Sequence, residues 1–397
     1  MRILFITRVY PYPSHAGDLQ YTAGIIESLS AVEEVQVTVF CGSGMPDTVT
    51  KSNARWLGQK ETKGRTADFR SLTSRYPRAA ERALSPDGIK ALDVLLKEND
   101  FDIVLLNEAV TAKAKPIVDK HNLPSIYISH NVDADIRPQI AAASKKRVLR
   151  WVQMLDAAKY RKMELGLLKQ IQGLTTISRE DQDRYKELGC AVPSKVLKPG
   201  YAHSGLEKPH AHDRRNKIAV LVGSFEWNAK ISNLEMILAA YEKYTAGISL
   251  LPFRLRIAGK APPKVVKRLS ARYPEVEFMC PFEHLSDVVK DARVALVLEE
   301  MGGGFKLKTL DYIFSDLAIV AFAHAMQGTE LTPGLEYQDA PTMEKAIEIV
   351  HQLIGDVERL EDMTYAARQK AETEYDWNTR AIILLHLAEA AIKHYND

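Results

Sequence analysis

The chain has 397 residues, of which 46% are hydrophobic and 26% are charged, and its formal net charge is +2. This composition is typical of a soluble globular protein, and the length exceeds what one hydrophobic core usually organises, so we expect two domains. The apolar runs are no longer than strands, so no membrane-spanning helix is expected. The first residues, MRILFITRVY, carry charges within the apolar run and predict a buried strand, not a signal peptide.

The cysteines indicate the cellular compartment, and the basic residues limit the kinds of binding partner to expect. Cys41, Cys190 and Cys280 are isolated, which fits a reducing compartment, so we expect a cytoplasmic location without disulfides or a zinc site. The basic residues gather in two clusters, Arg65, Arg70, Arg75, Arg78 and Arg82, and then Lys145, Lys146, Arg147 and Arg150. These are either solvated faces or a surface for anionic lipid headgroups or an anionic acceptor. Aromatic residues do not interleave with them, so nucleic acid is not an expected partner.

The first half alternates short apolar strands with amphipathic helices, the pattern of a parallel sheet. Strands are expected at residues 3–7, 35–40, 103–106, 125–129, 174–177 and 196–197, and helices at 20–30, 88–98, 112–121, 151–170 and 179–188. Residues 41–85 are polar, rich in arginine and weakly periodic, so we interpret them as a variable, partly helical insertion.

Two features of the first half are candidates for a site, because ligands of parallel sheets bind beyond the carboxyl ends of the strands. Gly17 lies in the loop after the first strand, where it either lets a substrate approach the backbone or is an ordinary turn glycine. His130 follows a buried strand, where an imidazole can act on a substrate hydroxyl or phosphate. The alternative is a histidine hydrogen-bonded to a loop.

A polar segment at residues 201–216 separates the two halves. We interpret it as a linker, because its three histidines match no metal-ligand spacing. The second half repeats the pattern, with strands at 218–222, 254–258, 276–279, 294–298 and 318–322 and helices at 233–244, 285–291 and 306–314. Three further helices are expected at 343–354, 360–374 and 378–394, and the last is apolar enough to pack onto the first domain.

The stretch 294–328 reads as strand, glycine-rich turn, helix and strand. Glycines at 302–304 let the backbone approach a ligand, and the N–H groups at a helix start favour an anion. Lys306 and Lys308 add cations where the helix dipole does not favour them, so we expect an anion to offset them. Asp311 follows about one turn later, which suits a sugar hydroxyl beside a phosphate. The alternative is an ordinary tight turn, since glycine-rich motifs match by chance.

Seven segments, taken in chain order, carry a further signal: MRILFITRVYPYPSHAGD, ISHNVD, GLTTISREDQDRYKEL, VGSFEWNAKISNLEMI, LRIAGKAPPKVVKRL, GGGFKLKTLDYIFSDLAIVAF and DWNTRA. Together they resemble the retaining GT-B glycosyltransferases that use nucleotide sugars, and most of all the branch that builds bacterial polysaccharides and glycolipids. The resemblance covers nearly the whole chain except about residues 42–70. It implies an α/β fold with two Rossmann-like α/β/α domains facing a central cleft.

The resemblance also implies how the chain is divided. Residues 1–200 would form the acceptor-binding domain, 201–216 the linker and 217–375 the nucleotide-sugar-binding domain. Residues 376–397 would form a helix that crosses back onto the N-terminal domain.

The resemblance further implies residue roles in the second domain. The donor diphosphate would lie against Gly304 and Lys308, and Asp311 stands where the family usually has a glutamate that binds the ribose hydroxyls. Gly303 stands where the family usually has a glutamate for the donor sugar. That departure leaves the sugar unidentified, with Glu299 or Glu300 as candidate replacements.

Other site positions follow from the same segments. Lys230 stands where many relatives place a cation for the diphosphate, and Ser224 where they place an arginine. His130 matches a histidine near the donor sugar and acceptor. The acceptor-side loop corresponds to Gly17 and Asp18, and the remaining donor-site positions are Gly223, Phe305, Lys306, Thr309 and Leu310.

These assignments predict an enzyme that transfers a sugar, with retention, from a UDP- or GDP-linked donor to a hydroxyl of a glycan, glycolipid or polysaccharide precursor. His130, Lys230 and Lys308 would be catalytic, and the lysines would stabilise the leaving diphosphate. No metal-binding Asp-x-Asp motif is visible, so we expect neither a metal nor a cofactor. Peripheral contact with an anionic membrane, at its inner face, is a further expectation. The alternatives are a nucleotide-sugar epimerase and a non-catalytic nucleotide-sugar-binding subunit, the second favoured by Gly303 and Asp311.

Overall fold

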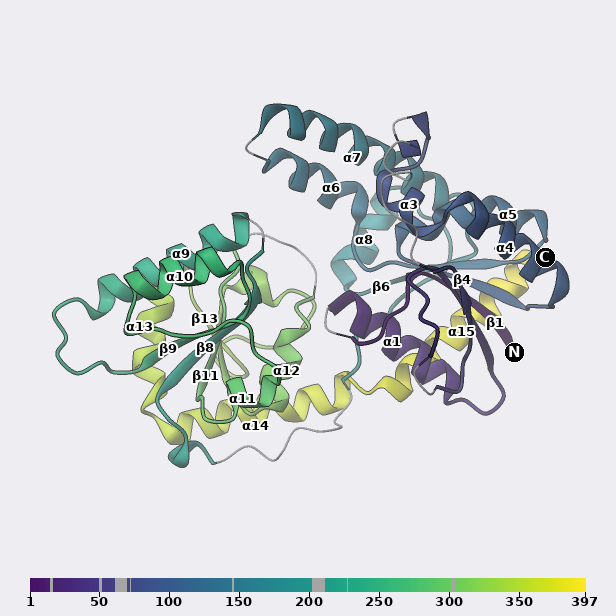
Figure 1. The fold of residues 1–397 in the computed structure, drawn as a ribbon. Coiled ribbons are helices and arrows are strands. Elements are labelled where there is room, and N and C mark those ends of the chain that lie inside the picture. Colours follow the sequence, from purple (N-terminus) through teal and green to yellow (C-terminus); the bar gives the residue numbers. More distant parts are fainter. Residues whose placement is uncertain are drawn as a thin grey trace. The chain divides into compact units, whose positions relative to one another are not determined.

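The computed structural model describes residues 1–14, 17–49, 52–60, 70–71, 73–144, 146–201, 211–226, 228–300 and 305–397. The chain divides into two compact units (Figure 1). Unit 1 comprises Met1–Gly200 and Asp376–Asp397, and unit 2 comprises Tyr201–Tyr375. Within these described ranges, no helix combines the length and the apolar character that crossing a bilayer requires.

Unit 1 is built on a seven-stranded sheet with the order β3-β2-β1-β4-β5-β6-β7, and every described pairing is parallel. The strands are β1 (Arg2–Val9), β2 (Gln36–Ser43), β3 (Arg55–Gly58), β4 (Ile103–Asn107), β5 (Ser125–Ile128), β6 (Gly173–Thr176) and β7 (Ser194–Val196). The inner strands are buried on both faces, which explains their unbroken apolar runs.

Helices cover the faces of this sheet. They are α1 (Gly17–Ser30), α3 (Arg78–Ala83), α4 (Pro86–Glu98), the 3-10 helix η1 (Ala109–Ala114), α5 (Lys115–Lys120), α6 (Asp133–Ala142), α7 (Arg147–Leu167), α8 (Arg179–Glu187) and α15 (Trp377–Asn396). Sequence periodicity missed two elements of this unit. β3 is only four residues long with exposed ends, and α6 contains Pro138, which obscures a helical pattern. The single helix expected at 112–121 is η1 followed by α5.

Unit 2 is built on a six-stranded parallel sheet with the order β10-β9-β8-β11-β12-β13. The strands are β8 (Ile218–Ser224), β9 (Arg254–Lys260), β10 (Glu277–Met279), β11 (Val294–Val297), β12 (Ala318–Ala321) and β13 (Gln338–Asp339). The helices are η2 (His212–Arg214), α9 (Asn228–Thr245), α10 (Pro263–Arg272), α11 (Leu285–Val289), α12 (Lys308–Phe314), η3 (Ala323–Met326), α13 (Met343–Ile354) and α14 (Val357–Glu374). Part of the segment expected to be a linker packs here, since His212 and Arg215 are buried.

The last helix, α15, packs on α1 and on β5, β6 and β7 of unit 1, as expected for a C-terminal helix that returns to the first domain. Its first residue, Trp377, lies against two glycines. A Cβ atom on Gly24 would lie 2.0 Å from Cζ2 of the indole, and one on Gly200 would lie 2.3 Å from Cδ2. Only glycine therefore leaves room for this ring.

Gly24→Ala is expected to destabilise the protein by about 3 kcal/mol, because the added methyl group overpacks the site against Trp377. Gly166→Ala is the matched control. Gly166 lies in α7, and a Cβ atom added there would have nothing within 4 Å, so alanine should instead stabilise by about 0.5–1 kcal/mol. Chemical denaturation measures both changes, and equal effects of the two substitutions would contradict the packing described for Trp377.

In each sheet the chain order reverses beside the first strand. This happens between β1 and β4 in unit 1 and between β8 and β11 in unit 2. Loops leaving the carboxyl ends of such a strand pair run in opposite directions and leave room for a ligand. Both switch points carry clusters of charged side chains.

Candidate active site

The switch point of unit 2 holds a buried carboxylate surrounded by lysines. Glu299 lies two residues beyond β11, and its side chain is 9% exposed. Its Oε1 accepts a hydrogen bond from Lys308, the first residue of α12, and lies 3.9 Å from Nζ of Lys230 in α9. Lys308 also donates to the carbonyl of Val222 on β8 at 3.2 Å. Lys306 contributes a third positive charge that acts on Glu299. The cluster thus contains three lysines and one carboxylate.

The backbone that carries Glu299 is held by two side chains. Asn233 of α9 donates to the carbonyl of Leu298 at 2.9 Å and accepts from the N–H of Glu300 at 3.1 Å. Nε2 of His324 lies 2.9 Å from the carbonyl oxygen of Glu299. Because a carbonyl only accepts, this nitrogen carries the proton. These contacts fix the direction in which the carboxylate faces the lysines.

Burial and mutual attraction set the charges of this cluster. Burial lowers the pKa of Lys306 to about 8, although Glu299 acts in the opposite direction. Burial also lowers the pKa of Lys308, again against the pull of Glu299. Burial alone would raise the pKa of Glu299, but the lysines, Lys308 foremost, outweigh it and lower that pKa. At neutral pH the positive charges are therefore in excess, which favours a ligand with more than one negative charge.

Glu299, not Glu300, is the carboxylate of the site. Glu300 is exposed, whereas Glu299 is buried. Among the residues that the structure describes, no group hydrogen-bonds the second, buried oxygen of Glu299. Glu299 is therefore better suited to act as a counter-ion that orients the lysines than to contact a sugar from solvent.

Gly223 and Ser224 end β8 beside this cluster. Gly259 of β9 has a φ of +142°, and a Cβ there would lie 1.7 Å from the carbonyl oxygen of Gly223, so the two backbones approach closely. Ser224 donates through Oγ to Oε2 of Glu226 at 2.9 Å. The position at which the resemblance places an arginine thus holds a hydroxyl bonded to a carboxylate.

Three of the predicted donor residues lie in α12. Thr309 and Leu310 are 0% and 1% exposed, so both residues belong to the core. Asp311 accepts a hydrogen bond from Tyr201. Burial raises the pKa of Asp311 to about 7, and the Tyr201 hydroxyl limits the rise. The Tyr201 ring stacks on Phe314 with 4.2 Å between ring centroids.

Two predicted donor positions flank this helix on the N-terminal side. The ring of Phe305 packs against Tyr375 with 5.5 Å between centroids. Gly303 and Gly304 lie outside the described residues.

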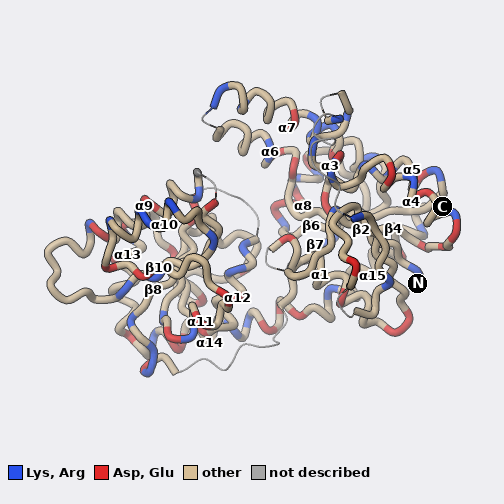
Figure 2. The backbone as a smooth tube through the Cα atoms, viewed as in Figure 1, with Lys and Arg blue, Asp and Glu red and all other residues tan. Residues whose placement is uncertain are grey.

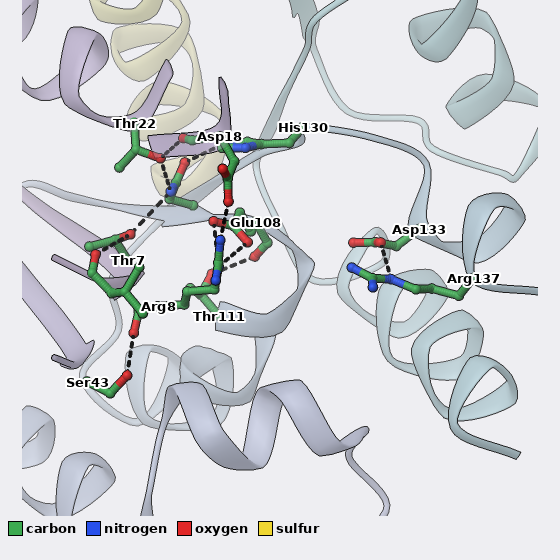
Figure 3. Close-up of polar contacts among 12 residues, drawn as sticks. Thr7, Arg8, Asp18, Thr22, Ser43, Glu108, Thr111, His130, Asp133 and Arg137 are labelled. Atoms are coloured by element: carbon green, nitrogen blue, oxygen red, sulfur yellow. Dashed lines mark hydrogen bonds and ion pairs between the residues drawn. The ribbon is translucent and has the colours of Figure 1, made fainter. Parts of the chain in front are cut away.

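The switch point of unit 1 carries a second cluster, centred on Arg8 (Figure 3). Arg8 lies near the end of β1, and its Nε donates to Oε2 of Glu108 at 2.8 Å while its Nη2 donates to Asp18. Glu108 directly follows β4, and Asp18 lies in the first turn of α1, which begins at Gly17. Glu108 has a φ of +67° and a ψ of 151°, a conformation that is rare outside glycine. Such strain concentrates at functional sites.

The carboxyl of Glu108 is paired with Arg8 and surrounded by protein. Burial raises its pKa to about 7, and the neighbouring Asp18 adds to the rise against the pull of Arg8. Sequence reasoning did not single out Arg8 or Glu108. A signal was present, because polar residues at 107 and 108 directly follow the apolar strand 103–106 and so had to lie at the carboxyl edge of the sheet.

His130 is held in one tautomer by Asn107. The amide nitrogen of Asn107 donates to Oγ1 of Thr22 at 3.0 Å and of Thr7 at 3.3 Å, and its oxygen lies 2.9 Å from Nε2 of His130 (Figure 3). Nε2 therefore carries the proton, and Nδ1 is the acceptor. The ring also meets Tyr21 edge to face at 4.9 Å. Burial lowers the pKa of His130 to about 4, so the imidazole is neutral at physiological pH.

The structure thus brings the predicted residues together in two groups, one per unit. Lys230, Lys306 and Lys308 meet around Glu299 in unit 2, whereas Asp18 and His130 lie in the cluster of unit 1. In the ranges that the structure describes, no group of three or more His, Cys, Asp or Glu side chains could hold a metal ion.

No protein-family model matches the chain, and no curated protein sequence matches it. Solved structures do match over almost the full length. Sucrose-phosphate synthase from Thermosynechococcus elongatus has a TM-score of 0.73 at 15% identity, covering 99% of this chain and 100% of that one. HepE from Anabaena, in complex with UDP and glucose, has a TM-score of 0.69 at 11% identity, with coverages of 98% and 100%.

The lipopolysaccharide outer core galactosyltransferase WaaB has a TM-score of 0.62 at 14% identity, covering 97% of this chain and 100% of that one. All three similarities extend through both units. The chain has the GT-B fold. This confirms the fold class that the ordered sequence segments predicted, with two parallel-sheet α/β domains.

Proposed function

We propose that this protein is a glycosyltransferase that moves a sugar from a nucleotide diphosphate sugar to an acceptor hydroxyl. One observation carries the proposal: three lysines surround one buried carboxylate at the switch point of a GT-B unit. The fold supports it, since similar structures include HepE with UDP and glucose and a galactosyltransferase. Of the two nucleotides considered, the HepE complex favours UDP.

The proposed donor site uses the lysines as a preorganised counter-charge. Negative charge develops on the diphosphate as the bond to the sugar breaks, and cations already aimed at it lower the barrier. Lys308 and Lys230 share Glu299, which keeps them in place before the donor arrives. Asp311 would accept a hydrogen bond from a ribose hydroxyl beside the one it accepts from Tyr201.

The proposed acceptor groups belong to unit 1. Asp18 is oriented by Arg8, and His130 offers an unprotonated Nδ1 at neutral pH. We further propose retention of the anomeric configuration, independence of metal ions, and a cytoplasmic enzyme whose acceptor is a glycan, a glycolipid or a polysaccharide precursor. Leaving-group oxygens would assist deprotonation of the acceptor, so no carboxylate nucleophile is required.

The affinity for UDP should fall as the pH rises through about 8. Lys306 has a pKa of about 8 and binds a diphosphate as the protonated cation, which is lost above that pH. Between pH 7 and pH 9 the dissociation constant should increase by up to about tenfold. Lys306→Arg keeps its charge throughout, so its affinity should stay nearly constant over this range. A wild-type profile as flat as that of the arginine variant would remove Lys306 from the site.

The activity is tested with purified protein, a panel of labelled nucleotide sugars and glycan or lipid-linked acceptors. Transfer, or slow donor hydrolysis without an acceptor, supports the proposal, and NMR of the early product reports the anomeric configuration. Interconversion of the sugar with no acceptor would identify an epimerase instead. Tight UDP-sugar binding without any turnover would identify a non-catalytic binding subunit, the alternative that the departures at Gly303 and Asp311 favour. The same assay with an added metal chelator tests whether transfer is independent of metal ions.

A further inference from the structure

Most residues in the first half of α7 are exposed. α6 and α7 pair as a helical hairpin that projects from the rest of unit 1 (Figure 1). Every residue from Lys146 to Val152 is exposed, although the hairpin belongs to an otherwise well-packed unit. This segment therefore presents its side chains to the surroundings and not to a core.

One face of this exposed helix is apolar. Val148, Trp151, Val152 and Leu155 follow the spacing i, i+3, i+4 and i+7, which places them on a single stripe. They are 79%, 65%, 46% and 48% exposed. In a soluble protein such a stripe normally faces a core, and a contiguous exposed one marks an interaction site.

The same segment carries only positive charge. Residues 139–155 contain Lys145, Lys146, Arg147 and Arg150 and no aspartate or glutamate. Figure 2 shows basic residues at the end of the hairpin. Of these, Arg147 and Arg150 lie within the same turns of α7 as the apolar stripe. A partner must therefore accept apolar and cationic groups side by side and be negatively charged itself.

We propose that the α6–α7 hairpin docks on a membrane surface that contains anionic lipid. A bilayer interface meets both demands, because apolar side chains enter the acyl boundary while lysine and arginine reach the phosphates. Tryptophan, here Trp151, is the residue most favoured at that depth. The inference goes beyond the proposed function: it locates the surface by which the enzyme would reach a lipid-linked acceptor, and it can be measured with no donor present.

The test is co-sedimentation of the full chain with vesicles. Phosphatidylcholine vesicles with and without phosphatidylglycerol are compared at low and high salt. The wild type should bind the anionic vesicles, and binding should weaken with salt because the headgroup attraction is screened. Val148→Ser with Trp151→Ser should weaken binding about tenfold or more by removing apolar anchors. Arg147→Glu with Arg150→Glu should weaken it similarly, by removing attraction to the anionic lipid.

Leu250→Ser with Leu335→Ser is the matched control, since both leucines are exposed apolar residues of unit 2, at 85% and 58%. This variant should bind vesicles like the wild type. Failure of the wild type to bind, or equal binding by all variants, would overturn the proposal. So would a wild-type dimer that Val148→Ser with Trp151→Ser converts to monomer, because the stripe would then serve a second copy of the chain. The affinity of the same variants for UDP should equal that of the wild type. The membrane proposal and the proposed donor site can therefore fail independently of each other.

Discussion

Replacing Lys308 by methionine together with Glu299 by glutamine is expected to lower turnover at least about 100-fold, the loss typical of removing one preorganised charge from a transition state. The double substitution is needed because the two side chains form a buried pair. Lys308→Ala alone would remove the nearest cation from the buried carboxylate of Glu299 and cost about 3 kcal/mol of stability, which would confuse folding with catalysis. Replacing both partners removes one positive and one negative charge together, so the net charge of the cluster stays the same with Lys230 and Lys306 in place, and the thermal transition should move little.

The matched control is Lys264→Met, which removes an exposed lysine of α10 and should leave turnover unchanged. Steady-state transfer rates and thermal melts of the wild type and both variants are measured together. Wild-type turnover in the double variant, with the protein folded, would eliminate Lys308 as a catalytic residue.

His130→Ala is expected to lower turnover about 100-fold while changing the dissociation constant for UDP by less than about threefold, since a positioned imidazole acts on proton transfer and not on nucleotide binding. The buried ring is neutral because its pKa is about 4. Any inflection of the wild-type pH–rate profile near pH 7 should therefore come from other groups, such as Glu108 and Asp311, whose pKa values are about 7, and should persist in His130→Ala.

His121→Ala provides the control for this prediction. His121 lies in unit 1 and pairs with Asp93 at 2.7 Å, away from Asn107 and its partners, so its loss should leave turnover unchanged. If both histidine variants keep full activity, His130 is only the buried hydrogen-bonding partner of Asn107.

The fold was predictable from the sequence because each strand and helix has a local hydrophobic pattern, and the alternation of strand and helix repeats along the chain. Apolar runs such as ILFI and IVLL belong to strands buried on both faces, and each is followed by an amphipathic segment. The elements missed are those whose pattern is weak: a four-residue edge strand, β3, and a helix interrupted by Pro138. Contacts between residues far apart in the chain also could not be predicted from local patterns. The packing of Trp377 against Gly24 and Gly200 is an example.

The candidate site was predictable only in part, for a related reason. Lys306 and Lys308 stood out because two lysines at a helix start need an anion. Their buried partner Glu299 and the tie between Asp311 and Tyr201 depend on which side chains the sheet brings together, and spacing does not encode that. The ion pair of Arg8 with Glu108 spans 100 residues and follows from the pairing of β1 with β4.

The central claim, that the lysines around Glu299 hold a nucleotide diphosphate, is tested most directly by calorimetric titration of UDP and of uridine. The wild type should bind UDP and bind uridine far more weakly, because the phosphates supply the charge that the lysines require. The variant with Lys308→Met and Glu299→Gln should bind UDP at least about tenfold more weakly while remaining folded. Equal affinity of the wild type for UDP and uridine, or unchanged UDP affinity in the variant, would contradict the account.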